Sequence, residues 1–189
     1  MEEMLRQHIE QVIPLTDEEY SFVRKHFGVK RCQKGDLLIA KNGPVRHVFL
    51  VISGLLKLVH HDKKGREHIV SFAMEDWWEC DYPAWFARAP ASLDLCCIED
   101  TQVYCLSFDD YQTICTKVHK MQHFFLHKAN RGHLASQERI ISLLTATPTE
   151  RYELVQRKQP TLVQRVPKAI LAAYLGLSRE TLSRLWRQN

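Results

Sequence analysis

Residues 166–187 read VPKAILAAYLGLSRETLSRLWR and indicate two short helices joined by a tight turn. Apolar residues recur at helical spacing before the turn. Gly176 permits the left-handed conformation that ends a helix, and Ser178 can cap the helix that follows. Leu182 and Leu185 give this second helix one apolar face. The stretch therefore predicts a helix-turn-helix.

The polar side chains of the second helix are expected on its outer surface. Arginine can form paired hydrogen bonds with guanine, and glutamate can accept one from cytosine. A plain pair of packed helices with a solvated charged face is the alternative. The candidate DNA-binding residues are Ser178, Arg179, Glu180, Thr181, Ser183 and Arg184, with Arg187 further along the same surface.

Residues 178–184, SRETLSR, resemble the recognition helix of the Crp/Fnr family of transcriptional regulators. In that family the matching Arg, Glu and Arg contact base edges, while the Ser and Thr contact phosphates. The resemblance covers nearly the whole chain and implies a homodimer that binds double-stranded DNA and senses a small effector. In the family the recognition helix is usually followed by a β wing. The few residues that follow it here leave no room for a wing, so we expect the domain at residues 146–189 to lack one.

Composition and charge agree with a globular protein that binds a phosphate-rich partner. Hydrophobic residues are 45% and charged residues 25% of 189. The acidic, amphipathic start differs from a secretory signal, and no apolar run is long enough to cross a bilayer, so a cytoplasmic location is expected. The net charge is +4. Residues 155–189 hold many Lys and Arg but a single acid, Glu180, which places a phosphate partner at that end.

Six cysteines occur without any C-x-x-C pair, so the sequence gives little support to a zinc or iron–sulfur site. Reduced thiols are expected in a cytoplasm. A redox-sensing role for one of them stays open. The cysteines are Cys32, Cys80, Cys96, Cys97, Cys105 and Cys115.

The N-terminal part predicts helices followed by a β-roll. Residues 3–27 indicate one or two short helices, and Thr16 can cap one of them. From Val29 the apolar period changes to two, with turns at residues 34–36, 42–44, 53–54 and 62–65. Many short strands at nearly regular spacing indicate an antiparallel barrel or jelly roll. The fold class is therefore α+β, and residues 1–117 resemble the family's cyclic-nucleotide-binding β-roll, a double-stranded β-helix.

Residues 77–92, WWECDYPAWFARAPAS, resemble the family's phosphate-binding cassette. Alignment places Cys80 at the usual Gly, Asp81 at the ribose-binding Glu and Ala91 at the phosphate-binding Arg. The cassette thus lacks its Gly and its Arg, so we expect cyclic AMP to bind weakly or not at all by the usual mode. The resemblance leaves an unknown small effector, with candidate binding residues Asp81, Arg88, Ser92, Ser136 and Gln137.

Residues 118–145 indicate a long connecting helix. Met121, Phe125, Ala129 and Gly132 continue one stripe at three- and four-residue steps. Simple packing onto the β-roll is one explanation of the stripe. We favour a dimer seam. The small residues allow two helices to approach closely, and a protein that binds two symmetry-related DNA half-sites must be a dimer. The family dimerises through its helix at this position.

Other chemistry finds little support in the sequence. Ten histidines raise the alternative of a metal-dependent cupin enzyme. His60 and His61, however, are adjacent on a strand and should point to opposite faces. No Walker loop, G-x-G-x-x-G or G-x-S-x-G motif occurs. We expect neither metal nor cofactor and no enzyme activity. A sensor that does not bind DNA, with a residual helical tail, is the other alternative.

Overall fold

Two short helices open the chain. A computed structural model describes residues 2–188, without the side chains of residue 2 and residues 186–188, so the surface position expected for Arg187 lies outside the described side chains. The helices are α1 (Glu2–Glu10) and α2 (Asp17–Lys25). Thr16 caps α2: its Oγ1 accepts the Glu19 N–H at 3.3 Å, and the Glu19 carboxylate accepts the Thr16 N–H at 2.8 Å. This reciprocal pair confirms the cap predicted at Thr16.

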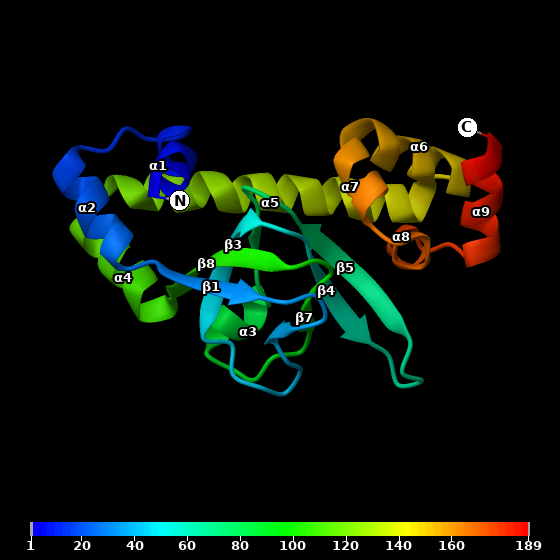
Figure 1. Ribbon diagram of the computed structural model, residues 1–189, viewed down its shortest axis with the longest axis horizontal. Coiled ribbons are helices and arrows are strands. Elements are labelled where there is room, and N and C mark those ends of the chain that lie inside the picture. Colours follow the sequence, from blue (N-terminus) through cyan, green and yellow to red (C-terminus); the bar gives the residue numbers. More distant parts are fainter. Residues whose placement is uncertain (1, 189) are drawn as a thin grey trace.

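The middle of the chain forms two four-stranded antiparallel sheets, with strand orders β1-β8-β3-β6 and β2-β7-β4-β5. They face each other as the β-roll seen in Figure 1. The predicted antiparallel roll is therefore confirmed. The strands are β1 (Gly28–Cys32), β2 (Leu37–Ile39), β3 (His47–Ser53), β4 (Leu56–His61), β5 (Glu67–Ala73), β6 (Trp78–Glu79), β7 (Asp94–Cys97) and β8 (Thr101–Ser107).

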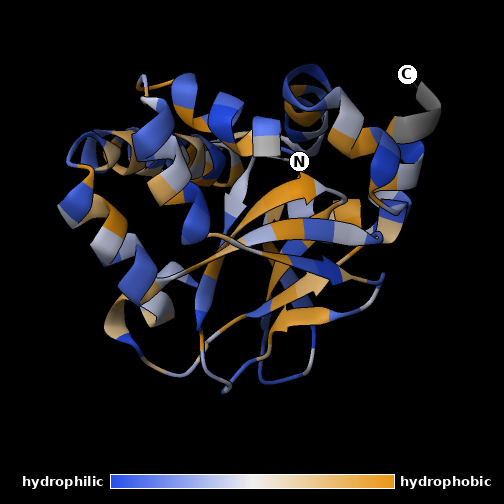
Figure 2. Ribbon diagram, turned by 60° about the vertical axis from the view of Figure 1, so that its left-hand side comes forward, coloured by the Kyte–Doolittle hydropathy of each residue, from blue (hydrophilic) through white to orange (hydrophobic). Residues whose placement is uncertain are grey.

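The predicted turns separate these strands, and the apolar residues between them form the core. Gly54, between β3 and β4, has φ +103°, and a Cβ there would come within 2.7 Å of the Asp100 carbonyl oxygen. Only glycine fits this crossing without strain. Leu50, Leu56 and Leu95 are fully buried. Much of the hydrophobic colour in Figure 2 accordingly falls on the strands.

One helix is inserted between strands of the roll, and two more lead from the roll to the rest of the chain. The short α3 (Tyr82–Ala87) lies between β6 and β7, and α4 (Phe108–Lys117) follows β8. The chain then turns at Val118 and His119 and restarts as α5 (Lys120–Thr145). Figure 1 shows α5 running along the length of the molecule above the roll. The predicted long helix is confirmed, with its start two residues later than expected.

A bundle of four helices lies at the far end of α5 (Figure 1). Its members are α6 (Pro148–Lys158), α7 (Pro160–Arg165), α8 (Lys168–Leu175) and α9 (Arg179–Gln188). Tyr152, Leu171 and Leu182 are buried between them. The same cluster of buried side chains includes Ile69 and Phe72 of β5. The bundle and the roll therefore share one apolar core where α8 contacts β5.

Candidate nucleic-acid interface and effector cassette

Helices α8 and α9 form the helix-turn-helix that the sequence predicts. Gly176 ends α8 with φ +65°. Arg151 of α6 supports this end of the helix, because its Nη1 donates to the Leu175 carbonyl oxygen at 2.7 Å. The Ser178 hydroxyl accepts the Thr181 N–H at 3.1 Å and so begins α9. Both turn residues singled out in the sequence thus have the expected conformations.

The outer face of α9 is polar and its inner face is apolar. Leu182 and Leu185 are buried in the bundle. The side chains of Ser178, Arg179, Glu180 and Arg184 are exposed, and those of Thr181 and Ser183 are half-buried. The pKa of the Glu180 carboxyl is lowered, because the carboxylate accepts hydrogen bonds from its own backbone N–H and from Ser178. The described side chains of α9 therefore present two cations and one anion to solvent at neutral pH.

Arg139 of α5 joins three elements and was not singled out in the sequence. Its guanidinium donates to the carbonyl oxygens of Ile69 and Val70 on β5, at 2.9 and 3.1 Å. It also donates to the Tyr174 carbonyl oxygen of α8 at 2.9 Å and lies 3.6 Å from the centroid of the Tyr174 ring. Arg139 thereby links the long helix, the edge strand of the roll and the first helix of the helix-turn-helix. The sequence offered no signal for it, because a lone arginine on a long helix is ordinary.

The cassette encloses Asp81 instead of presenting it. Asp81 is fully buried and caps α3 through the Ala84 N–H, at 3.3 Å. Its Oδ2 accepts the Ser92 N–H, the Ser92 hydroxyl and the Leu93 N–H, at 2.7, 2.9 and 3.1 Å. The structure thus brings together two of the predicted effector residues, Asp81 and Ser92. They bind each other, so the Asp81 carboxylate is used in folding the loop.

The other cassette positions are also filled. The Cys80 thiol is buried and donates to the His47 carbonyl oxygen at 3.4 Å. Ala91 is buried, and its backbone bonds in both directions with the turn at residues 42–43. The cassette therefore presents a methyl group where the family's arginine is expected.

The three remaining effector candidates are not hydrogen-bonded to the pair Asp81 and Ser92. Arg88 is exposed, forms an ion pair with Asp109 of α4 and lies over the Phe108 ring at 4.7 Å. Ser136 and Gln137 are exposed on α5, and the Ser136 hydroxyl donates to the Gly132 carbonyl oxygen at 2.9 Å. Arg88 is thus engaged with α4 in this structure.

A buried acid beside the cassette, Glu79 of β6, escaped the sequence analysis. The Ser71 hydroxyl donates to one carboxylate oxygen at 2.5 Å, and the Cys80 N–H donates to the other at 3.0 Å. Burial raises the pKa of Glu79 to about 7, and these two hydrogen bonds offset the shift only in part. The only signal in the sequence was an acid inside the apolar run at residues 77–80.

The predicted stripe on α5 is buried in its first half and exposed in its second half. Met121 is fully buried, and Phe125 contacts Trp78 and Tyr111 of its own chain, at 6.0 and 4.8 Å between ring centroids. Met121 and Phe125 therefore face the roll, as in the alternative of simple packing, whereas Ala129 and Gly132 are exposed. Larger exposed apolar residues lie, with Ala129 and Gly132, on the solvent side of the helix. They are Leu126, Leu134, Ile140, Ile141 and Leu144, each more than half exposed.

Metal-binding side chains do not gather in the described part of the chain. Among the residues that the structure describes, no three His, Cys, Asp or Glu side chains are placed to hold a metal ion. Two histidines of the β4–β5 hairpin contact carboxylates, with His61 Nδ1 at 3.0 Å from Asp94 and His68 Nε2 at 3.2 Å from Asp62. None of the described helices is both long and apolar enough to cross a membrane.

The geometry is shared with known regulators. Residues 29–118 match the cyclic nucleotide-binding domain family. The c-di-GMP responsive global regulator CLP of Xanthomonas campestris has a similar structure, with TM-score 0.72, 15% identity, and 92% and 91% of the two chains covered. FixK2 from Bradyrhizobium japonicum is similar with TM-score 0.70 and 18% identity, and the match covers 86% of this chain and 83% of that one. A crp/fnr family protein from Eubacterium rectale is similar with TM-score 0.69 and 14% identity, and the match covers 92% of this chain and 83% of that one.

No curated protein sequence matches the chain significantly. At identities below one fifth, the solved structures establish the fold. Together with the family match of the roll, they confirm the architecture that the resemblance implied. Residues 29–118 thus match the cyclic nucleotide-binding domain family, and the chain has the fold of the Crp/Fnr-type regulators.

Proposed function

We propose that the chain is a homodimeric, DNA-binding transcriptional regulator of the Crp/Fnr type. The observation that carries this proposal is the exposed set Arg179, Glu180 and Arg184 on a helix whose other face is buried. These side chains have the chemistry to bind guanine and cytosine edges in the major groove. The fold that the chain shares with CLP and FixK2 supports the same class of function.

The exposed apolar stripe of α5 supports a dimer. Leu134 is 59% exposed and Leu144 is 79% exposed, on a helix that the roll covers only along its other side. Contiguous apolar surface of this kind marks interaction sites in soluble proteins. The stripe ends beside a groove of about 460 Å³ between α5 and α6, lined in part by Ile141 and Leu154. A second α5 is the partner that fits a straight stripe of this length.

The effector is proposed to differ from cyclic AMP. Asp81 is bound to Ser92, and Ala91 offers no charge to a phosphate. A buried acid, Glu79, lies next to the cassette and would repel an anion when ionised. DNA binding is therefore either constitutive or set by another small molecule.

Selection of bound fragments from a random DNA pool tests the proposal. The purified chain should enrich a site with two related half-sites about one helical turn apart. A double variant with Arg179→Ala and Arg184→Ala should enrich nothing. If the parent chain also enriches nothing while remaining folded, the sensor that does not bind DNA becomes the better account.

A further inference from the structure

Two cysteines from different sheets of the β-roll meet in its core. Cys32 is the last residue of β1 and Cys97 is the last residue of β7. They are 6% and 3% exposed, and their thiols are hydrogen-bonded to each other. A short turn between the sheets brings the strand ends together. The Gly35 N–H donates to the Cys97 carbonyl oxygen, and the Cys97 N–H donates to that of Asp36, each at 2.9 Å.

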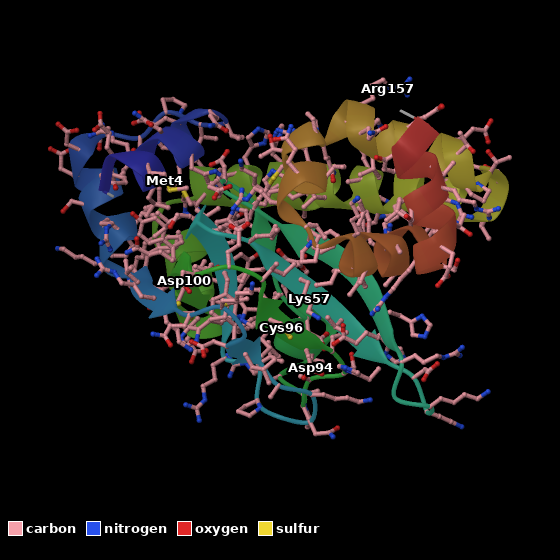
Figure 3. The ribbon with its side chains drawn as sticks, turned by 45° about the vertical axis from the view of Figure 1, so that its right-hand side comes forward. Met4, Lys57, Asp94, Cys96, Asp100 and Arg157 are labelled. Carbon is pink, nitrogen blue, oxygen red and sulfur yellow. The ribbon has the colours of Figure 1, made fainter. Side chains whose placement is uncertain are left out.

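Other thiols of the chain have different neighbours. The Cys80 thiol donates to the His47 carbonyl oxygen, and the Cys115 side chain is hydrogen-bonded to Tyr111. Cys96 is the residue opposite Lys57 in the β4–β7 register, and both are labelled in Figure 3. Cys105 of β8 is close enough to Cys32 for their charges to interact. Cys105 is paired with Gly28 in the β1–β8 register, four residues from Cys32, and Cys115 is a suitable control.

An open polar cleft of about 600 Å³ lies beside one member of the pair. Its lining includes Arg31, Cys32, Asp36, Asp100 and Gln102, of which Asp100 is labelled in Figure 3. The cleft is large enough for a small polar oxidant to come close to Cys32. Cys97 is not among the residues that line the cleft.

The surroundings distinguish the two thiols. Burial raises the pKa of both, and that of Cys97 to about 12. The positive charge of Lys30 and the hydrogen bond from Cys97 both favour the thiolate of Cys32. The thiolate is the nucleophilic form of cysteine. Cys32 is therefore the attacking thiol and Cys97 the resolving one.

We propose that Cys32 and Cys97 form a redox-active pair that hydrogen peroxide oxidises to a disulfide. The Cys32 thiolate attacks one peroxide oxygen, the O–O bond breaks, and Cys32 becomes a sulfenic acid while water leaves. The Cys97 sulfur then attacks the Cys32 sulfur, the S–O bond breaks, and a second water leaves. Two thiols and one hydrogen peroxide thus give one disulfide and two waters. The new bond would tie β1 to β7 and so join the two sheets.

Hydrogen peroxide treatment of the reduced full-length chain tests the pairing. Peptide mapping by mass spectrometry should find a Cys32–Cys97 disulfide in the parent and in a Cys115→Ser control, and dithiothreitol should reverse it. The rate should rise about tenfold from pH 7 to pH 8, because the thiolate fraction rises by that factor below the pKa. A Cys97→Ser variant should accumulate sulfenic acid at Cys32 that dimedone traps.

Three results would overturn the proposal. One is a folded parent chain, checked by circular dichroism, that keeps both thiols reduced under conditions that oxidise free cysteine. The second is pairing of Cys32 with Cys105. The third is dimedone labelling of Cys97 but not of Cys32 in matched Cys32→Ser and Cys97→Ser variants. Mapping on the parent chain decides the pairing even if a serine variant does not fold.

Discussion

The guanidinium of Arg165, on α7, forms a two-pronged ion pair with the carboxylate of Glu99, in the loop between β7 and β8. The distances are 3.1 Å from Nε to Oε1 and 2.7 Å from Nη2 to Oε2. Nη1 also reaches the Glu75 carboxylate at 2.6 Å, and Nη2 reaches the Gly54 carbonyl oxygen at 2.9 Å. One side chain of the helical bundle thus binds three points of the roll. A paired geometry restricts direction as well as distance, so Arg165 helps to orient the helix-turn-helix on the roll.

Replacing Arg165 with Ala should weaken the attachment of the bundle to the roll. Glu75 and Glu99 are partly exposed, which reduces the value of their ion pairs. We expect the free energy of unfolding to fall by about 1–2 kcal/mol, measured by urea denaturation. Backbone amides of β4 and β5 should also exchange faster. Arg157→Ala, on the exposed side of α6, is the matched control and should change neither. Equal behaviour of the two variants would contradict the role of Arg165.

Glu79 should make stability depend on pH between about 4.5 and 7. Its pKa in the folded chain, about 7, is above the ordinary 4.5, so the folded state binds more protons than the unfolded state in this window. Stability is therefore highest at acid pH and falls as pH rises through 7. Glu79→Gln keeps the shape without ionising, and should gain about 3 kcal/mol relative to the parent at pH 8 and little at pH 4. Urea denaturation at both pH values measures this difference, and a gain that is the same at both would contradict the prediction.

A charge on the exposed face of α5 should separate the proposed dimer. Leu134→Glu places a carboxylate without a partner in the seam, at a cost of several kcal/mol if it stays buried. Light scattering is expected to give a dimer for the parent and a monomer for this variant. Leu37→Glu changes a leucine of β2 that is 49% exposed, and it should leave the dimer intact. A monomeric parent, or a dimeric Leu134→Glu variant, would count against the seam.

Local sequence patterns were enough to predict the helices, strands and turns. They failed where contacts between residues far apart in the sequence determine the structure. The capping box at Thr16, the left-handed Gly176 and the turns of the roll each depend on a few neighbouring residues, so the sequence specified them. The seam on α5 depends on which face the roll covers, and periodicity alone cannot choose between two apolar faces. Arg165 and Glu99 are 66 positions apart, and no local rule connects them.

The cassette shows the same limit within one site. Alignment located Asp81 and Ser92, but their role follows from the hydrogen bonds between them, which an alignment does not show. The raised pKa of Glu79 likewise depends on its depth in the folded roll.

The recognition helix should lose specific binding when either arginine is removed. Arg179→Ala or Arg184→Ala is expected to cost about 1–3 kcal/mol at a selected site and to relax the preference at one base per half-site. Fluorescence anisotropy with the selected duplex measures the loss. Lys63→Ala, in the exposed β4–β5 hairpin, should bind as the parent does. If Arg184→Ala binds as tightly as Lys63→Ala, α9 does not read bases.

Cyclic AMP should bind weakly or not at all, because the residues that would hold it serve the fold. Asp81 accepts three hydrogen bonds from the loop at residues 92–93. Ala91, whose side chain is a methyl group, stands where the family has its phosphate-binding arginine. Calorimetry with millimolar nucleotide should therefore detect little heat, whereas micromolar affinity would contradict this reading of the cassette.

The variant Asp81→Asn tests separately whether the Asp81 carboxylate stabilises the fold. It loses acceptor capacity at a buried site, so we expect it to lower the free energy of unfolding by about 1–3 kcal/mol. If this variant were as stable as the parent, Asp81 would be free to bind a ligand.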